Sequence, residues 1–263
     1  MNIYVMVDAE GISGIHLREQ VMSSGPLYAE LREYMTQEIN VCVEGLKAGG
    51  ADKIIVRDAH GSGTNVLWHK LSPLAYEYVI GNSGTVRMPG IEECDAVVLL
   101  GYHAMAGTPM AVLEHTMSSL SWQNFWINGR KSGEVAIDAA VAGDYNKPVI
   151  MVSGDDKVCA EAAELLPGVV TAQVKKGISI YGARHLPMEK AHKLIREKAA
   201  EAVRKAISGE IRPYKVSTPV TLRLELVERG LIPNIHSKPY ARIIDGRTYE
   251  VTGNSMEEAL ARL

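Results

Sequence analysis

Two carboxylates stand directly after the first apolar run of the chain. Residues 3–7 read IYVMV, and Asp8, Glu10 and Gly11 follow them. Residues two apart in an extended segment point the same way, so the two carboxylates project together. Burying two unpaired carboxylates costs much free energy, which a bound cation would offset. The pattern predicts a cation site, although a solvated pair or a turn cap at a strand end would have the same sequence.

Two later apolar runs also end in polar side chains. Residues 53–56 (KIIV) lead to Asp58 and His60, and residues 96–100 (AVVLL) lead to His103. In an open parallel sheet, the carboxyl ends of the strands form the ligand crevice. We therefore expect three strand ends to deliver carboxylates and imidazoles to one edge of the sheet.

A fifth candidate ligand is Glu134, which follows Gly133 at the start of a predicted helix. An acid in the first turn of a helix is also an ordinary, favourable placement. Taken together, the candidates offer only nitrogen and oxygen atoms, a mixture that suits Zn or Mn. A catalytic zinc usually has three protein ligands, so five side chains favour two metals about 3.5–4 Å apart. The predicted set is Asp8, Glu10, His60, His103 and Glu134, with Asp8 as the bridging carboxylate.

The elements that must position these residues alternate between strands and helices. The predicted strands are apolar runs at residues 3–7, 53–56, 76–80, 96–100, 148–152 and 169–174. Helical patterns lie between several of them, at residues 28–48, 132–144 and 155–165. This order predicts an α/β fold with a mostly parallel central sheet flanked by helices.

The pattern changes in the last quarter of the chain. Pro187 opens a long charged amphipathic helix, and a polar connection follows at residues 208–213. The segment 218–226 alternates as a half-exposed strand does, and a last strand near 247–251 and a helix at 255–262 complete the chain. We predict a metal-binding α/β catalytic domain at residues 1–210 and a small appended α+β subdomain at residues 211–263.

Composition excludes several classes of partner. The 263 residues carry a formal net charge of −3 without a block of like charges, so neither nucleic acid nor an anionic membrane is the expected partner. No apolar run approaches the roughly 20 residues of a membrane span, and the first residues lack the features of a signal peptide. Three scattered cysteines do not suggest a disulfide framework. We expect a cytoplasmic protein acting on a small substrate.

Five short motifs occur in an order and spacing that resemble one known family. They are DxEG at 8–11, DxHG at 58–61, GYHA at 101–104, EHT at 114–116 and NG…GE at 128–134. Each motif is weak alone, but together they are similar to the DppA-type D-aminopeptidases, peptidase family M55. The resemblance extends over most of the chain, including LREYMTQEIN and VKKGIS, without a departure at the candidate ligands.

The resemblance implies an aminopeptidase with two zinc ions per subunit. Such an enzyme hydrolyses short peptides or amides that begin with a D-amino acid, typically D-Ala. The family's metal ligands match Asp8, Glu10, His60, His103 and Glu134, and its catalytic histidine matches His115. The resemblance also implies a homodecamer of two stacked pentameric rings, whose active sites face an inner chamber.

The reaction expected from this set is metal-assisted amide hydrolysis. A water bridging the two metals would attack the peptide carbonyl. His115 would stabilise the oxyanion or pass a proton to the leaving amine, because imidazole titrates near neutral pH. Asp58 is placed to orient a ligand from outside the metal's immediate shell, or merely to form a turn.

Two other functions fit the same cluster. A metal-dependent amidase or phosphoesterase could use it on another substrate, although no arginine cluster near the motifs favours phosphate. A non-catalytic metal- or peptide-binding protein is the third alternative. Replacing His115 by alanine separates these classes, since only an enzyme would lose turnover while it keeps its metal.

Overall fold

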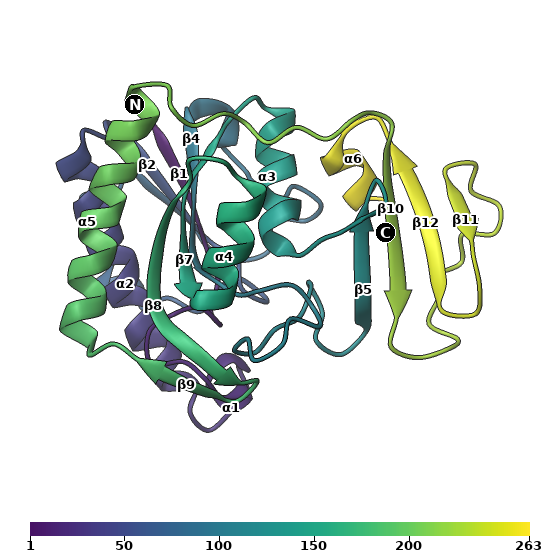
Figure 1. The fold of residues 1–263 in the computed structure, drawn as a ribbon, viewed down its shortest axis with the longest axis horizontal. Helices are drawn as coiled ribbons and strands as arrows, with labels where there is room; N and C mark the ends of the chain where they lie inside the picture. The colour runs from purple at the N-terminus through teal and green to yellow at the C-terminus, as the bar shows by residue number, and fades with distance from the viewer.

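A seven-stranded sheet forms the centre of the computed structural model, which describes residues 1–263 (Figure 1). Its strands, in spatial order, are β3 (Glu77–Val79), β2 (Ile54–Asp58), β1 (Ile3–Val7), β4 (Ala96–Tyr102), β7 (Val149–Asp155), β8 (Val170–Ser179) and β9 (Gly182–His185). All neighbours pair in parallel except β8 and β9, which are antiparallel. The predicted mostly parallel α/β sheet is confirmed.

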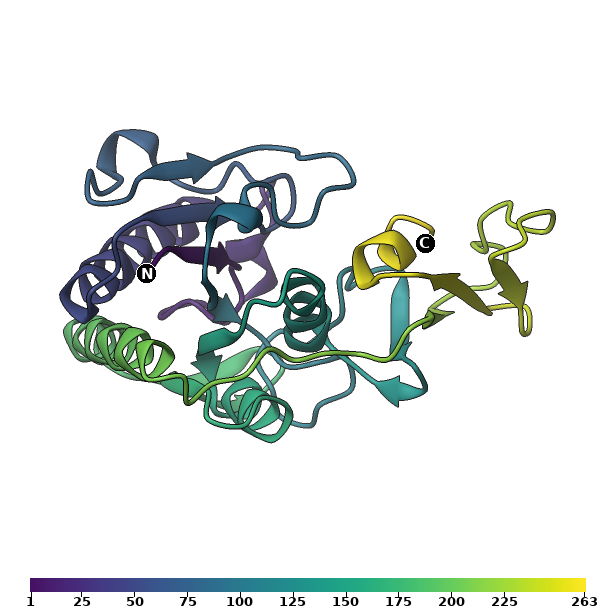
Figure 2. The ribbon, with the colours of Figure 1, turned by 90° about the horizontal axis from the view of Figure 1, so that it is seen from above.

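Four helices cover the two faces of this sheet. Helices α2 (Tyr28–Gly49) and α5 (Met188–Ile207) lie side by side on one face (Figure 2). Helices α3 (Glu134–Asp144) and α4 (Asp156–Leu165) lie on the other face. A short helix, α1 (Arg18–Val21), and two 3₁₀ turns at 68–70 and 91–93 interrupt the loops.

Strand β1 shows why strands of the central sheet appear as continuous apolar runs in the sequence. Its residues alternate between two cores: Ile3, Val5 and Val7 pack toward α2 and α5, whereas Tyr4 and Met6 pack toward α3. All five side chains are fully buried. A strand that is covered on both faces has no solvent side, so its sequence does not alternate between apolar and polar residues.

A second, antiparallel sheet lies beside the first. Its order is β11 (Ala241–Ile243), β12 (Thr248–Gly253), β10 (Val220–Leu226), β5 (Trp122–Ile127) and β6 (Arg130–Lys131), and helix α6 (Met256–Leu260) packs against it. Because β10 pairs with β5, the C-terminal strands share their sheet with an earlier part of the chain. The domain boundary near residue 210 stays a prediction.

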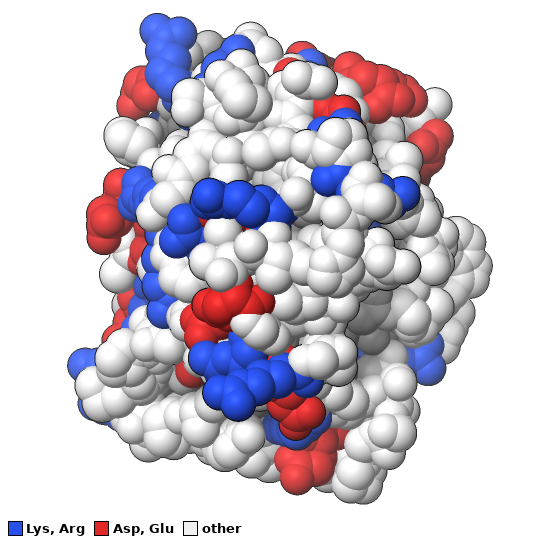
Figure 3. All heavy atoms as spheres, turned by 90° about the vertical axis from the view of Figure 1, so that its right-hand side faces the viewer, with Lys and Arg blue, Asp and Glu red and all other residues white.

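Charged side chains of both signs gather over the second sheet. Glu250 forms ion pairs with Arg223 and Arg242, and Glu225 forms one with Arg247. Figure 3 shows blue and red atoms interspersed on this side of the molecule. The face therefore has no uniform charge that would steer a polyanion toward it.

None of the helices is both long enough and apolar enough to cross a bilayer.

Candidate metal centre

The three predicted strand ends meet at one edge of the central sheet. Val7, the last residue of β1, is in register with Asp58 of β2 and with Leu100 of β4. The strand order reverses direction between β1 and β4, and such a switch point opens a crevice beyond the carboxyl ends of the strands. The segments after these strands carry four of the five candidate ligands into that crevice, and the fifth, Glu134, is the first residue of α3.

Two glycines let the loop after β1 and the end of β4 approach each other. A Cβ atom at Gly11 would lie 2.1 Å from the carbonyl oxygen of Tyr102, and one at Gly101 would lie 2.5 Å from the carbonyl oxygen of Asp8. Gly101 also has a φ of +73°, which side chains rarely tolerate. The glycines of the DxEG and GYHA motifs therefore serve close backbone packing at the site.

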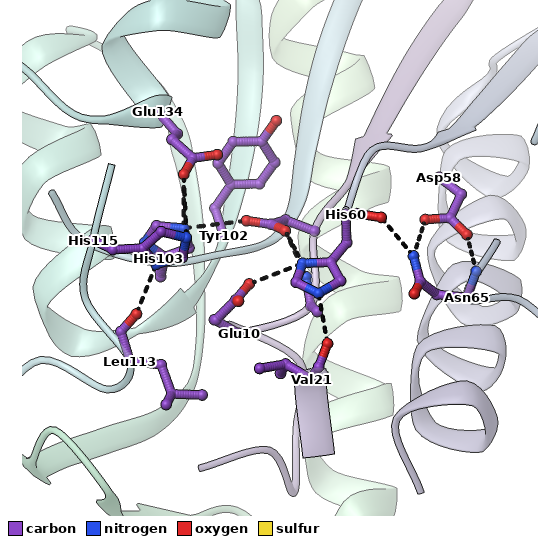
Figure 4. Close-up of polar contacts among 12 residues, drawn as sticks. Glu10, Val21, Asp58, His60, Asn65, Tyr102, His103, Leu113, His115 and Glu134 are labelled. Atoms are coloured by element: carbon purple, nitrogen blue, oxygen red, sulfur yellow. Dashed lines mark hydrogen bonds and ion pairs between the residues drawn. The ribbon is translucent and has the colours of Figure 1, made fainter. Parts of the chain in front are cut away.

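Asp8 lies between two histidines and faces each with a different oxygen. Its Oδ1 atom is 3.1 Å from Nδ1 of His60, and its Oδ2 atom is 3.3 Å from Nε2 of His103 (Figure 4). Glu10 joins the first side, with Oε2 3.4 Å from His60 Nδ1. Glu134 joins the second side, with Oε1 3.2 Å from His103 Nε2. The five predicted ligands therefore form two groups that share Asp8.

His115 approaches the second group. Its Nε2 atom lies 3.7 Å from Glu134 Oε1, while its Nδ1 atom is 2.9 Å from the carbonyl oxygen of Leu113. A carbonyl can only accept, so Nδ1 carries a proton and Nε2 of the neutral ring is free to bind a proton or a metal. By distance alone, His115 could also act as a ligand with His103 and Glu134.

The donor atoms fit a pair of metal ions. Three buried atoms, Asp8 Oδ2, Glu10 Oε2 and His103 Nε2, have no hydrogen-bond partner and all face the cluster. Buried polar atoms normally have a hydrogen-bond partner, so three atoms without one that face the same point indicate a bound ligand. The atoms are carboxylate oxygens and imidazole nitrogens without a thiolate, the mixture of catalytic zinc sites.

The electrostatics of the cluster favour positive charge. Burial alone would lower the pKa of His103, but the carboxylates of Glu134 and Asp8 raise it well above its ordinary value. Burial would raise the pKa of Asp8, but the adjacent imidazoles of His103 and His60 hold it well below its usual range. The Asp8 carboxylate is thus ionised and prefers a cation beside it, and metal binding would compete with protons on the imidazoles.

Asp58 does not contact the imidazole of His60. Its carboxylate accepts hydrogen bonds from the backbone N–H and the side-chain amide of Asn65, at 2.6 and 2.7 Å. The same amide donates to the carbonyl oxygen of His60 at 2.8 Å. Any orienting effect of Asp58 therefore passes through Asn65 and the backbone, and its role at the metal site stays a prediction.

A cavity of about 630 Å³ opens over the cluster. Asp8, Glu10, His60, His115 and Glu134 line it, whereas His103 lies beneath them and is 1% exposed. Apolar side chains form much of the remaining wall, among them Val21, Met22, Leu120, Trp122, Ile180 and Tyr181. The volume is that of a small-molecule site.

Two residues outside the motifs, Arg87 and Asp138, also support the cluster. Asp138 accepts two hydrogen bonds from Arg87, at 2.7 and 2.8 Å, and one from the hydroxyl of Tyr102 at 2.5 Å. Arg87 in turn lies 3.9 Å from Glu134. No spacing in the sequence connects these residues. One feature of the sequence could have pointed to them: Asp138 is an acidic residue four positions after Glu134, on the buried face of the same predicted helix.

The fold places a carboxylate and imidazole cluster, whose donor atoms suit metal ions, at the switch point of an open α/β sheet, where such folds bind their ligands. The chain belongs to the Peptidase_M55 family of D-aminopeptidases, which matches residues 1–263. This confirms the family expected from the five motifs.

Two comparisons with individual proteins agree. The chain is 35% identical over 250 residues to a D-aminopeptidase of Bacillus subtilis, covering 94% of this chain and 89% of the relative. It is also similar to a solved structure, described as a Zn-dependent D-aminopeptidase, DppA, from Bacillus subtilis and a self-compartmentalizing protease. That match has a TM-score of 0.92 and 34% identity, and covers 100% of this chain and 95% of the other.

Proposed function

We propose that this protein is a zinc-dependent aminopeptidase that cleaves short peptides or amides with an N-terminal D-amino acid of the D-Ala type. It would use two zinc ions and a water that bridges them. The observation that carries the proposal is the position of Asp8, whose two oxygens face two separate groups of ligands. The similarity to a Zn-dependent D-aminopeptidase supports both the metal and the substrate.

The residues divide between the two proposed zinc positions. One ion would be held by Asp8, Glu10 and His60, and the other by Asp8, His103 and Glu134. The backbone N–H of Met117 donates to Glu134 Oε1 at 2.7 Å, which fixes that carboxylate at the start of α3. When bound, the ions would polarise the peptide carbonyl and lower the pKa of the bridging water toward 7.

His115 would handle the proton that the leaving amine needs. Its Nδ1 atom is held by the carbonyl of Leu113, so the ring presents Nε2 toward Glu134 and the cavity. A protonated Nε2 would donate to the departing nitrogen, and a neutral one would accept a proton from water. Its partly accessible side chain, 15% exposed, allows contact with a bound peptide.

The cavity limits the substrate to a small molecule. A volume of about 630 Å³ accommodates a short peptide, and its apolar wall would pack against small side chains. One of the ions held at its base would bind the free α-amine of the substrate in its neutral form. These features agree with an exopeptidase that removes the first residue of a short peptide.

Assembly into a homo-oligomer is part of the proposal. The similar DppA structure is described as self-compartmentalizing, and the motif resemblance implies a decamer of two stacked pentamers. Large apolar side chains are exposed at Trp68, Tyr76 and Leu120, which a partner subunit could cover. Light scattering tests this, and a stable monomer would contradict it. The cytoplasmic location stays a prediction.

The direct test of function is hydrolysis of D-Ala and L-Ala p-nitroanilides side by side, by protein stripped with a chelator and reloaded with zinc. We expect metal-dependent release from the D-substrate alone. Cleavage of the L-substrate would contradict the stereochemical part of the proposal. If a protein that holds two zinc ions cleaves neither substrate, the aminopeptidase proposal fails, and other amides become the candidates.

A further inference from the structure

A buried lysine lies behind the loop that carries two of the candidate ligands. This loop, residues 8–16, connects β1 to α1 and is called the ligand loop below. Lys175 reaches it from β8 and is only 1% exposed. Its Nζ atom donates hydrogen bonds to the backbone carbonyls of Glu10, Ile12 and Ile15, at 2.5, 2.9 and 2.7 Å.

These bonds use all the hydrogen-bonding capacity of the ammonium group. A protonated lysine has three donors, and each of them is directed at the ligand loop. Lys175 forms no ion pair with a carboxylate. The carbonyls of Glu10 and Ile15 accept no other hydrogen bond, whereas that of Ile12 also accepts the N–H of Ile15. Lys175 is therefore the only group that satisfies two of the loop's carbonyls.

The stability of the core does not explain a lysine at this position. Burying an ammonium group without a paired carboxylate has a large desolvation cost, and an apolar side chain of similar size avoids it. A methionine at position 175 would pack against the core as well as the lysine does. An apolar side chain, however, could not donate hydrogen bonds to the backbone carbonyls of the ligand loop.

Two other elements hold the same loop. Glu38 of α2 accepts a hydrogen bond from the N–H of Ser13 at 2.7 Å, and His185 of β9 accepts one from the N–H of Gly14 at 3.2 Å. By contrast, Oε2 of Glu10, the atom that faces His60, has no hydrogen bond of its own. The position of this carboxylate therefore depends on how firmly its backbone is held.

We propose that Lys175 is a positioning residue of the metal centre. It fixes the backbone at Glu10, so that the Glu10 carboxylate stands beside Asp8 and His60 before zinc binds. The inference rests on the proposed function only in that the metal is zinc. Lys175 acts through Glu10 and contacts neither the metal nor the substrate.

The test compares two lysines on the same strand. Lys175→Met removes the three donors and keeps the volume, whereas Lys176→Met makes the same change at an exposed neighbour. Zinc affinity is measured by competition with a chromophoric chelator, at a temperature where circular dichroism shows each protein folded. We expect Lys175→Met to bind zinc about 10- to 100-fold more weakly, which is the usual effect of removing a group that orients a metal ligand. Lys176→Met should bind zinc as tightly as wild type. Wild-type zinc affinity in folded Lys175→Met would overturn the proposal.

A second measurement needs no variant and covers the case in which Lys175→Met does not fold. Hydrogen exchange is followed in the wild-type chain with and without zinc. If the loop is held by the protein, the amides of residues 11–15 stay protected after zinc is removed. If they exchange freely while β1 stays protected, zinc itself orders the loop and the proposal is wrong. Neither measurement uses a peptide substrate, so failure of the aminopeptidase proposal would show separately.

Discussion

The ring of His115 stacks on the ring of His103, with centroids 4.0 Å apart and planes inclined by 11°. Both rings direct Nε2 toward the same oxygen of Glu134, at 3.2 Å from His103 and 3.7 Å from His115. They differ in access, because only His115 lines the cavity. Two similar imidazoles therefore have different positions, one buried beneath the candidate metal ligands and one in the wall of the cavity.

Replacing His115 by alanine tests its proposed role. We expect turnover of the D-Ala substrate to fall about 10²- to 10⁴-fold, because a positioned proton donor is lost. Zinc content, measured by mass spectrometry of the purified protein, should remain at two ions per chain. His69→Ala, at an exposed histidine, is the control and should change neither quantity. Loss of one zinc ion together with activity would instead identify His115 as a ligand.

Asp58→Asn tests whether Asp58, acting through Asn65, helps to position the candidate ligand His60. The carboxylate holds Asn65, which holds the carbonyl of His60. We expect zinc affinity to fall by about tenfold, at the lower end of what orienting partners of metal ligands contribute. Asp245→Asn changes a carboxylate that also accepts backbone N–H groups, but on the second sheet, and should leave zinc affinity unchanged. Equal effects of the two substitutions would exclude a specific role for Asp58.

Asp138→Ala should destabilise the protein strongly. Asp138 is fully buried and is the partner of both Arg87 and Tyr102. Its removal leaves the largely buried guanidinium with only the 3.9 Å contact to Glu134, and the loss of the closer ion pair costs about 3–5 kcal/mol. Chemical denaturation measures the loss. Asp144→Ala, at the end of the same helix, removes one exposed hydrogen bond to Glu257 and should cost about 1 kcal/mol. A small effect at Asp138 would show that Arg87 finds another partner.

Glu38 gives the stability a specific pH dependence. Burial raises the pKa of this carboxyl to about 7, because its bond to Ser13 and the charge of Lys175 only partly offset the loss of solvation. The folded protein therefore binds a proton that the unfolded chain has released. This favours folding at low pH, and the benefit is lost as pH rises from about 5 through about 7.

Glu38→Gln keeps the oxygen that accepts the Ser13 N–H and removes the titration. The variant should therefore gain stability relative to wild type as pH rises from 5 to 8, measured by denaturation of chelator-treated protein. Glu44→Gln, on an exposed turn of the same helix, is the control and should show no such trend. A difference between wild type and Glu38→Gln that does not change with pH would contradict the raised pKa.

The sequence predicted the large sheet well because its signals are local. Continuous apolar runs located β1, β2 and β4, and the polar residues after them marked the edge where the ligands meet. The same reasoning missed the hairpin of β5 and β6. Its turn, Asn128-Gly129, has positive φ at both residues, and Asn-Gly directly after the aromatic and β-branched run at 125–127 is a hairpin signal that could have located it.

Residues that act through the backbone could not be found in this way. Lys175 has backbone carbonyls as partners, contributed by residues about 160 positions earlier in the chain. Backbone carbonyls have no sequence signature, so nothing distinguishes Lys175 from the exposed Lys176 beside it. Only the register between β8 and its neighbours shows which of the two lysines is buried.

The most direct test of the account is a crystal structure of the zinc-loaded protein, with anomalous diffraction recorded at the zinc edge. The account predicts two peaks per chain about 3.5–4 Å apart, one on each side of the Asp8 carboxylate. Glu10 and His60 should coordinate one ion, and His103 and Glu134 the other. A single zinc peak, or two peaks that do not share Asp8, would contradict the central claim.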